Sequence, residues 1–526
     1  MVCRLLLGAM LALTLAAPPA RAQELRIGTQ SPFVIDPHFT FLGPDMAVAR
    51  EIYDSFVGRD AESRWVPGLA VSWTPVDDHT WEFKLRPGVT FSDGTPFTAE
   101  DIAFSFRRVM TLPTPSGFTS NMRSIVRTDI VDPLTVRVIT DRPNAVLPGQ
   151  LTNVFIVSAK LAAEASTADF QSGRAAVGTG PYKVVSYTRG DSLELARNDT
   201  YWGPKPAWAR VSKRVIGNDA SRVAALLAGD IDLIDDVPPT DVARLERTAG
   251  VKVFKQRSDR VMFLQPNTRL DRLPLVTDAA GAMLPANPLR DVRVRRALSL
   301  AIDRKALATR GFDGQAIPAT QLIPPGFGGY DDALPVLPYD PAAARRLLAE
   351  AGYPNGFGMT VACTNNRYVA DEKVCQIIGQ MLQRVGLQMK VETQPASMLF
   401  PRARPDVNEF PLLFAGQSNS TSRDPTHVLS LAVHSFDPKA GLGSSNRGGF
   451  SDPALDAMID AAVRRLDEGR EAALNAAMMR AVEVGATIPL YVQVVVAASR
   501  DGVAYQPRMD EQTVAQHATP TATKPH

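Results

Sequence analysis

Between residues 80 and 110 the spacing of apolar residues changes from that of a strand to that of a helix. Trp81, Phe83 and Leu85 alternate with polar residues, which is typical of a half-buried strand. A helix with one buried face is predicted further on by apolar residues at helical spacing: Ile102, Phe106, Val109 and Met110. The segment therefore predicts a strand followed by an amphipathic helix.

Turn and cap residues join this strand to this helix. Pro87-Gly88 turns the chain, and Asp93-Gly94 predicts a tight hairpin turn because glycine accepts positive φ angles. Thr98 to Asp101 reads Thr-Ala-Glu-Asp, a capping-box pattern with Thr98 at the N-cap. The stretch specifies its backbone closely and contains no Cys or His, so we interpret it as scaffold.

Strands and helices alternate along the rest of the chain. Asp340-Pro341 and Asp452-Pro453 each predict an N-cap followed by a proline in the first helical turn, and Gly352 ends the earlier helix. The later helix carries an apolar stripe: Leu455, Met458, Ile459, Ala462, Val463 and Leu466. Further elements are expected as strands over 25–28, 231–237 and 359–362, a hairpin over 182–195, and helices over 221–227, from Asp291 onward and over 369–385. This alternation predicts large mixed α/β lobes.

The N-terminus has the pattern of a secretory signal peptide. Arg4 precedes an apolar run from Leu5 to Ala17, which is too short to span a bilayer comfortably. Ala20-Arg21-Ala22 then offers an A-x-A cleavage site, so the mature protein is expected to begin at Gln23 in the periplasm. No second apolar run of about 18 residues follows, so we expect no direct membrane insertion.

Composition narrows the class of protein. A chain of 526 residues, 45% hydrophobic and 21% charged, is expected to form roughly two to four globular domains. Cleavage after Ala22 removes Arg4 and Arg21, so the count of basic residues falls from 57 to 55 and equals the 55 acidic residues. A mature chain without net charge gives no sign of nucleic acid or an anionic membrane as partner.

Two cysteines remain after cleavage, Cys363 and Cys375. Cys363 is expected at the end of the strand over 359–362, and Cys375 inside the helix over 369–385. Export permits a disulfide between them, and a turn brings them within reach. The alternative is a pair of buried thiols that pack as small hydrophobic groups.

Catalytic and metal-binding signatures are absent from the sequence. It contains no G-x-S-x-G, no H-E-x-x-H and no P-loop. His427 and His434 are seven residues apart, which on a helix separates them by about 10 Å, too far to share one zinc ion. The acidic run from Asp230 to Asp236 is interpreted as solvated edge or turn residues. We therefore expect no enzyme, no cofactor and no metal site.

Several long motifs, in order, resemble one protein family. The stretch "LRPGVTFSDGTPFTAEDIAFSFRRV" resembles the hallmark segment of the family-5 extracellular solute-binding proteins of ABC importers, the peptide- and nickel-binding class. The segments "GTGPYKVVSY", "NDTYWG", "LRDVRVRRALSLAIDRKAL", "YDPAAARRLLAEAGYPNGF" and "FSDPALDAMIDAA" are similar to later motifs of the family. The resemblance runs from about Leu25 to Arg508.

The resemblance implies a periplasmic-binding-protein fold, with two lobes joined by a hinge and an extra domain in one lobe. We expect a signal peptide over 1–22, a discontinuous lobe I over 23–65, 181–270 and 488–526, an extra domain over 66–180, and lobe II over 271–487. The hallmark segment would then be part of the extra domain. Ligand would be enclosed between the two lobes, which close around it.

The implied function is the periplasmic substrate-binding component of an ABC transporter. It would capture a peptide-like or other small solute and deliver it, as a monomer, to permease subunits at the inner membrane. Alternative ligands are a metal complex, haem or another non-peptide solute. A chemosensory binding protein with the same fold is a further alternative.

Candidate cleft residues come from segments that relatives use, from a strand-to-helix junction of the kind that often binds ligands in α/β folds, and from a glycine-rich loop before a helix. They are Phe118, the strand residues Phe263, Gln265 and Asn267, the strand-to-helix residues Asn366, Arg367 and Tyr368, and Asn446 and Arg447 in a glycine-rich loop. Arg447 could hold a carboxylate through two parallel hydrogen bonds.

The segment from Phe414 to Leu429 bears most directly on ligand class. Peptide-binding relatives usually have Gly-Trp here, and then an Asp that pairs with the α-ammonium of the peptide. In this chain Gln417 and Thr421 stand at those places, followed by Arg423 and Asp424. We therefore expect weak binding of peptides with a free N-terminus, unless Asp424 takes the role of the missing Asp. A neutral ligand, or an anionic one that contacts Arg423, is favoured instead.

Overall fold

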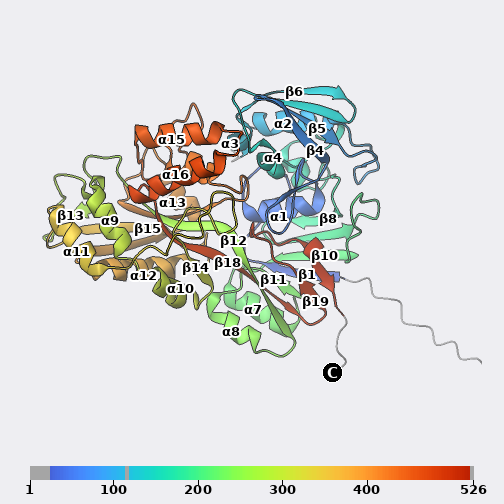
Figure 1. Cartoon of the computed structure of the whole chain (residues 1–526). Coiled ribbons are helices and arrows are strands. Elements are labelled where there is room, and N and C mark those ends of the chain that lie inside the picture. Colours follow the sequence, from blue (N-terminus) through green and yellow to red (C-terminus); the bar gives the residue numbers. More distant parts are fainter. Residues whose placement is uncertain (1–23, 113–117, 522–526) are drawn as a thin grey trace, which may run out of the picture.

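The computed structural model describes residues 24–112 and 118–521. The predicted signal peptide lies outside these residues. The described part is a mixed α/β protein, as predicted, with a twelve-stranded sheet, a separate four-stranded sheet and helices packed around them (Figure 1).

The twelve-stranded sheet extends through both halves of the molecule. Ten of its strands follow one another in the order β13 (Val276–Thr277), β15 (Gly358–Thr364), β17 (Leu412–Ser418), β12 (Val251–Pro266), β18 (Ile488–Arg500), β11 (Leu233–Ile234), β1 (Glu24–Thr29), β10 (Arg210–Val215), β9 (Ser192–Arg197) and β8 (Tyr182–Thr188). β16 (Gln388–Gln394) pairs with β15, and β14 (Ala316–Pro318) pairs with β18.

The long antiparallel strands β12 and β18 connect the two halves. Their pairing continues from Val251 to Leu264, with a register shift between Arg257 and Val261. In Figure 1 they lie between the half that holds α9, α11 and α15 and the half that holds β1, β8 and β10. The predicted two-lobed arrangement is therefore confirmed, while the residue boundaries of the lobes stay predictions.

The extra domain is built on the four-stranded antiparallel sheet. Its strand order is β4 (Ala70–Asp77), β5 (Thr80–Leu85), β7 (Thr135–Thr140) and β6 (Ile125–Asp132). Helix α2 (Ala99–Thr111) begins with the predicted capping box, in which the Thr98 main-chain N–H donates to Asp101 at 2.8 Å. Phe83 and Phe106 are buried, but Met110 is 43% exposed. Val109, the residue before Met110, faces the core, so Met110 lies at the edge of the buried face of the helix.

The helices around the other half are α9 (Val292–Leu300), α10 (Arg304–Phe312), α11 (Pro341–Glu350), α12 (Asp371–Gln383), α15 (Pro453–Arg464) and α16 (Arg470–Glu483). Three of them, α9, α11 and α15, begin at the predicted caps Asp291, Asp340 and Asp452. Asp340 and Asp452 accept hydrogen bonds from the first turns of α11 and α15. The predicted stripe of α15 is too long, because Met458 is 39% exposed and Leu466 lies beyond the helix end.

Most predicted elements in the first half are also found. The hairpin of β8 and β9 turns at Gly190, whose φ is 76°. The helices there are α1 (Gly43–Ile52), α7 (Asp219–Ala228) and α8 (Pro239–Glu246). The strand expected over 231–237 shortens to the two residues of β11, because Asp236 adopts a left-handed φ of 45° and ends the extended run. Asp235 and Asp236 are half-buried rather than solvated.

Short elements fill the connections that matter for the site. These are β2 (Gly58–Arg59), β3 (Trp65–Val66), α3 (Phe118–Met122), α4 (Leu147–Gln150), η1 (Leu151–Asn153), α13 (Ala396–Arg402), α14 (Thr426–Val428) and η3 (Leu429–Val433).

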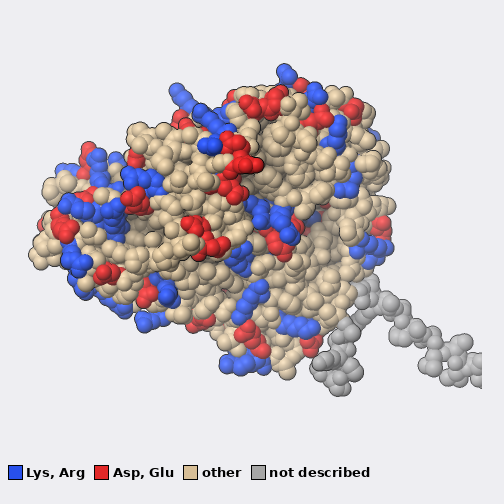
Figure 2. All heavy atoms as spheres, viewed as in Figure 1, with Lys and Arg blue, Asp and Glu red and all other residues tan. Residues whose placement is uncertain are grey.

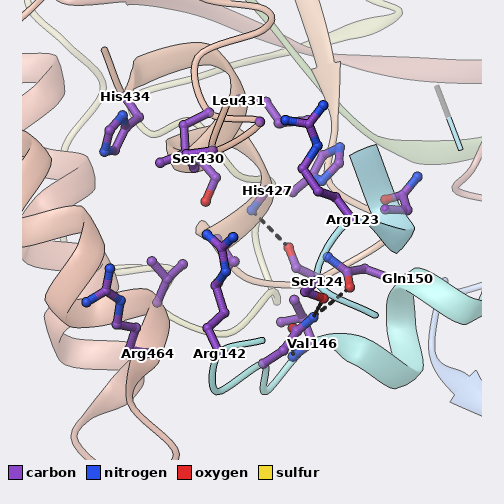
Figure 3. A pocket seen from close by; sticks show the side chains of 18 of the residues that line it. Arg123, Ser124, Arg142, Val146, Gln150, His427, Ser430, Leu431, His434 and Arg464 are labelled. Atoms are coloured by element: carbon purple, nitrogen blue, oxygen red, sulfur yellow. Dashed lines mark hydrogen bonds between the residues drawn. The ribbon is translucent and has the colours of Figure 1, made fainter. Parts of the chain in front are cut away.

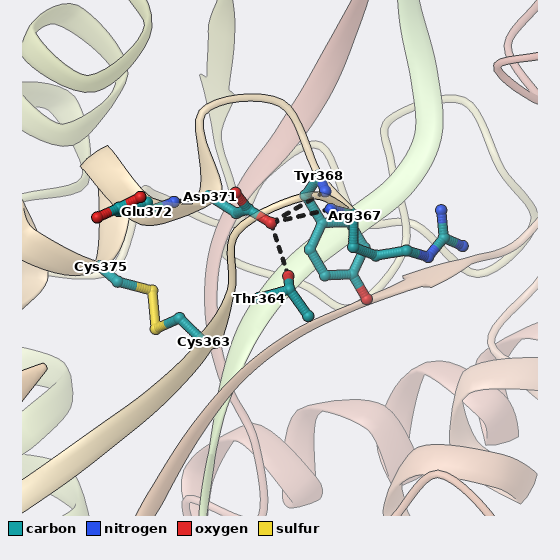
Figure 4. The surroundings of a disulfide bond; sticks show 7 residues. All are labelled: Cys363, Thr364, Arg367, Tyr368, Asp371, Glu372 and Cys375. Carbon is teal, nitrogen blue, oxygen red and sulfur yellow. Dashed lines mark hydrogen bonds between the residues drawn. A yellow bond between two sulfur atoms is a disulfide. The ribbon is translucent and has the colours of Figure 1, made fainter. Parts of the chain in front are cut away.

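The predicted disulfide is present. Cys363 and Cys375 are both fully buried, with their Cα atoms 6.6 Å apart (Figure 4). Cys363 lies inside β15 and not at its end, because that strand runs on to Thr364. The bridge ties β15 to α12 on either side of the loop over 365–370.

The surface carries both signs of charge. Figure 2 shows basic and acidic side chains interspersed over one face without a large patch of either sign. Within the described residues, no helix is long and apolar enough to cross a membrane.

Candidate ligand-binding site

A cavity of about 400 Å³ lies between the two halves of the molecule. One wall comes from the first half and the end of the chain: Phe41, Leu42, Gly43, Met46, Arg59, Asn153, Asp510 and Gln512. The other wall comes from β12, β17 and the loops of the second half: Arg260, Phe263, Arg367, Tyr368, Phe400, Ala415, Gly416, Gln417, Ser418, Ser420, Thr421, His427, Ser445 and Arg447. A molecule in this cavity would contact both halves at once.

Two arginine side chains lie against Tyr368 in the second wall, and a third, Arg447, lines the same cavity. The guanidinium carbons of Arg260 and Arg367 lie 5.7 and 5.3 Å from the centre of its ring. Arg447 lies near enough to interact electrostatically with Tyr368. The Tyr368 hydroxyl accepts a hydrogen bond from the Gly416 N–H at 3.2 Å, which fixes the ring between the arginines.

These arginines differ in how far their charge is neutralised. Arg260 pairs with Glu511 at 2.9 Å. Arg447 donates to the main-chain oxygens of Phe400 and Ala403, at 3.3 and 3.2 Å. Arg367 forms no ion pair within residues 24–112 and 118–521. Burial lowers the pKa of Arg367 and of Arg447, and the charge of Arg260 lowers that of Arg367 further. An anion placed here would relieve both effects.

A fourth arginine stands in the opposite wall. Arg59 is buried and donates to Ser420 at 3.1 Å and to Asn153 at 2.9 Å. Asp510 lies 3.8 Å from Arg59 and 2.7 Å from Arg508. Burial alone would raise the pKa of Asp510, but the two guanidinium groups hold it below its usual range. Among the described residues Asp510 is the only acidic side chain in the cavity wall, so the wall has an excess of positive charge.

The Asp371 carboxylate holds the loop with Arg367 and Tyr368 in place through hydrogen bonds. Asp371, at the start of α12, accepts hydrogen bonds from the Thr364 hydroxyl at 2.7 Å and from the Arg367 and Tyr368 N–H groups at 3.1 and 3.3 Å (Figure 4). The disulfide at the neighbouring Cys363 fastens the same corner. The position of the Arg367 side chain therefore rests on rigid elements on both sides.

Six of the residues predicted from the sequence line the cavity. They are Phe263, Arg367, Tyr368, Gln417, Thr421 and Arg447. Their contact with a ligand stays a prediction.

The other predicted residues lie outside the cavity wall. Gln265, Asn267 and Asn446 are buried and donate to main-chain carbonyls, so their amides support the loops around the site. The Asn366 side chain accepts a hydrogen bond from the Ala396 N–H. Phe118 is fully buried, but its ring packs at 4.9 Å against Phe41, which does line the cavity.

The loop after β17 places its charged residues away from the cavity. Arg423 donates to the Glu62 main-chain oxygen, and its guanidinium lies 4.8 Å from the Phe327 ring centre. Asp424 pairs with Arg470 at 3.1 Å and accepts from the Thr426 N–H at 2.8 Å. Thr421 lines the cavity in their place. No side chain of this loop thus offers an unpaired carboxylate to a ligand.

Sequence reasoning missed several residues of the wall. Arg59 and Asp510 come from segments that carry no motif, and only the fold brings them together. His427 and Arg260 could have been found, since His427 lies in the segment from Phe414 to Leu429 and Arg260 lies three residues before Phe263 in β12. No group of three or more His, Cys, Asp or Glu residues in the described part could hold a metal ion.

Solved structures with the same fold share almost the whole chain. DppA of Helicobacter pylori, in complex with the peptide STSA, superposes with a TM-score of 0.79 at 24% identity and covers 94% of this chain and 98% of its own. AgaA of A. tumefaciens R10, in complex with agropinic acid, gives 0.77 at 24% identity, with 95% and 99% covered. These likenesses show that the chain has the fold of a periplasmic binding protein.

The family is shown by the sequence. Residues 64–439 match the bacterial extracellular solute-binding proteins, family 5, and the chain belongs to this family. The glutathione-binding protein GsiB of Escherichia coli O1:K1 is 29% identical over 381 residues, covering 71% of this chain and 70% of GsiB. Family members are periplasmic substrate-binding components of ABC importers and not enzymes, which confirms the resemblance seen in the motifs.

Proposed function

We propose that this protein captures a small solute with at least one anionic group in the cavity between its lobes and delivers it to an ABC permease. The observation that carries this proposal is the arginine cluster around Tyr368, in which Arg367 has no ion-pair partner in the described residues. A buried guanidinium is stabilised most by a carboxylate or phosphate that it can bind through two parallel hydrogen bonds.

The names of the relatives support an acidic or peptide-like ligand. GsiB is named for glutathione, AgaA was solved with agropinic acid and DppA with a peptide. In this chain the cavity wall offers no unpaired carboxylate to an ammonium group, because Asp510 is already paired with Arg508. The ligand class favoured is therefore an acid whose amine is blocked or absent.

The remaining parts of the proposal concern the whole protein. The lobe boundaries given above, cleavage after Ala22, release into the periplasm and action as a monomer all belong to it. Closure of the lobes around the solute would present one surface made of both lobes to the permease.

Calorimetry with three matched probes tests the ligand class. N-acetyl-L-glutamate should bind, whereas L-glutamate, with its free ammonium, and neutral N-acetyl-L-glutamine amide should bind at least about tenfold more weakly. Arg367→Gln and Arg447→Gln should each weaken binding of N-acetyl-L-glutamate by about ten- to a hundredfold, because each removes a charge-assisted hydrogen bond.

Arg402→Gln is the matched control. The Arg402 side chain is 54% exposed, pairs with Glu392 and lies outside the cavity wall, so its loss should leave affinity unchanged. Equal binding of the neutral amide, or normal affinity in Arg367→Gln, would refute an anionic ligand. Mass spectrometry of the solute that co-purifies gives an independent answer.

A further inference from the structure

A second cavity, of about 320 Å³, lies between the extra domain and the second lobe (Figure 3). Its walls come from two distant parts of the chain. The extra domain contributes residues between Asn121 and Gln150, and the second lobe contributes residues between Thr421 and Arg464. Figure 3 shows Arg123, Ser124 and Val146 on one side and Ser430, Leu431 and His434 on the other.

Thr421 and His427 line both cavities, so these two residues lie between the first cavity and the second. The His427 ring forms no hydrogen bond to any residue in the described ranges, although its main-chain N–H is bonded to Ser422. Burial, and then the charge of Arg59, lower the pKa of His427 to about 4. The imidazole is therefore neutral at neutral pH and places no charge at the junction.

Two arginines of the second cavity, Arg142 and Arg464, have an acidic neighbour within the protein. Arg142 pairs with Asp141 at 2.9 Å, and Arg464 lies 3.6 Å from Asp460. His434 lies 3.5 Å from Asp460. Arg123, in the same wall, forms no ion pair within residues 24–112 and 118–521, but unlike the Arg367 side chain it donates hydrogen bonds to main-chain oxygens.

The remaining groups of the wall also favour an uncharged guest. Arg123 donates to the main-chain oxygens of Pro438 and Lys439, at 2.5 and 3.0 Å, and Asp437 accepts from two main-chain N–H groups of the same turn. The wall is mixed, and beside its polar residues it has apolar ones: Pro143, Val146, Leu431, Leu442 and Val463. A charged guest would compete with the contacts that Arg123 and Asp437 already make to the main chain, whereas an apolar or amide-containing chain can pack against the apolar residues.

We propose that the second cavity is a binding site for the uncharged tail of the solute whose anionic group occupies the first cavity. The ligand class is then an acid with an uncharged extension, such as an N-acylated acidic amino acid or an N-blocked peptide that passes His427. This inference rests on the proposed function, because it takes the anionic group of the ligand to be held at Arg367.

A series of N-acyl-L-glutamates tests the tail site by calorimetry on the full mature protein. The N-acetyl, N-butanoyl and N-hexanoyl compounds share one anionic head and differ only in tail length. A buried methylene strengthens binding by up to about fourfold, so N-hexanoyl-L-glutamate should bind at least about tenfold more tightly than N-acetyl-L-glutamate. N-(6-aminohexanoyl)-L-glutamate, with a charged end, should lose this gain.

Ser430→Trp and Ser430→Ala form a matched pair of variants. The Ser430 side chain lines the second cavity only, so tryptophan should fill that space while alanine leaves it open. Ser430→Trp should abolish the gain from the longer tail and leave N-acetyl-L-glutamate within about twofold of the parent protein. Ser430→Ala should behave as the parent does. A melting temperature close to that of the parent shows that each variant is folded.

Each outcome decides one of the two proposals. If N-acetyl-L-glutamate binds but tail length has no effect, or if Ser430→Trp retains the gain, the tail site is refuted and the anionic function stands. If no member of the series binds, both the anionic ligand and the tail site are refuted.

Discussion

At the scale of single residues, Asp259 is a buried carboxyl with little compensation. It lies in β12 where the register with β18 shifts, and it is fully buried. One of its oxygens accepts from the Ser63 hydroxyl at 3.3 Å, and the other has no hydrogen-bond partner in the described part of the chain. Burial, and then the charge of Glu511, raise the pKa of Asp259 to about 7.

This raised pKa predicts a dependence of stability on pH. Between about pH 4, where an unfolded Asp titrates, and about pH 7, the folded state binds more protons at this site, so the free energy of unfolding falls as pH rises. Asp259→Asn should remove that part of the dependence. Calorimetric melting should show the variant more stable than the parent at pH 8, by on the order of 2 °C, with little difference at pH 5.

Asp332→Asn, at an exposed carboxyl, is the control and should leave the pH profile unchanged. Parallel profiles for Asp259→Asn and the parent would show that Asp259 does not bind a proton in this pH range.

At the scale of elements, β15, the loop over 365–370 and α12 form the unit that holds the arginine cluster. The disulfide and Asp371 fasten this unit at its two ends. A loop of this size closed by a disulfide is expected to add about 3 kcal/mol to the free energy of unfolding, mainly by restricting the unfolded chain.

Removing the disulfide should therefore affect both stability and binding. Cys363→Ala combined with Cys375→Ala should lower the free energy of unfolding by about 2–4 kcal/mol in denaturant titrations. Affinity for N-acetyl-L-glutamate should fall by about threefold, because Arg367 is held less firmly. The parent treated with reductant should reproduce the effect, and thiol titration of the unfolded, unreduced mature parent should find no free thiol. Unchanged stability would show that the bridge does not form in the protein.

At the scale of the whole molecule, contacts between the lobes hold the cavity closed. Asn153 donates to Thr421 at 3.2 Å, and Arg59 donates to Ser420 at 3.1 Å. Gly149 lies so close to the Thr421 main-chain oxygen that a Cβ atom on it would be only 1.9 Å away. Arg123 adds hydrogen bonds to the main-chain oxygens of Pro438 and Lys439. Residues of both lobes therefore enclose the cavity.

Arg123→Ala should weaken closure without unfolding either lobe. Two charge-assisted hydrogen bonds at an exposed position are lost, so affinity for N-acetyl-L-glutamate should fall by about three- to tenfold while the melting temperature without ligand stays the same. Arg127→Ala is the matched control, because Arg127 lies in β6, four residues after Arg123, and its one ion pair in the described residues is with Asp129. Small-angle scattering should show a more extended unliganded molecule for Arg123→Ala. Unchanged affinity would show that this contact plays no part in closure.

The sequence by itself determined most elements and the class of protein. Asp340 and Asp452 mark their helices because a cap is a local hydrogen bond between neighbouring residues. The sequence placed Cys363 and Cys375 within reach of each other, but the choice between a disulfide and two buried thiols came from the structure. The family followed from motifs spread along its length.

Only the tertiary structure decided which side chains face the solute. Phe263 and Gln265 lie on the same face of β12, since they are two residues apart, yet Phe263 lines the cavity and the Gln265 side chain is covered by the main chain of Ala432 and Ser445. The approach of Arg59 to Asp510, far away in sequence, depends on how the end of the chain packs against the first half of the molecule. Local pattern fixes which side of an element is buried, but whether a buried side meets protein or an open cavity is set by contacts between distant segments.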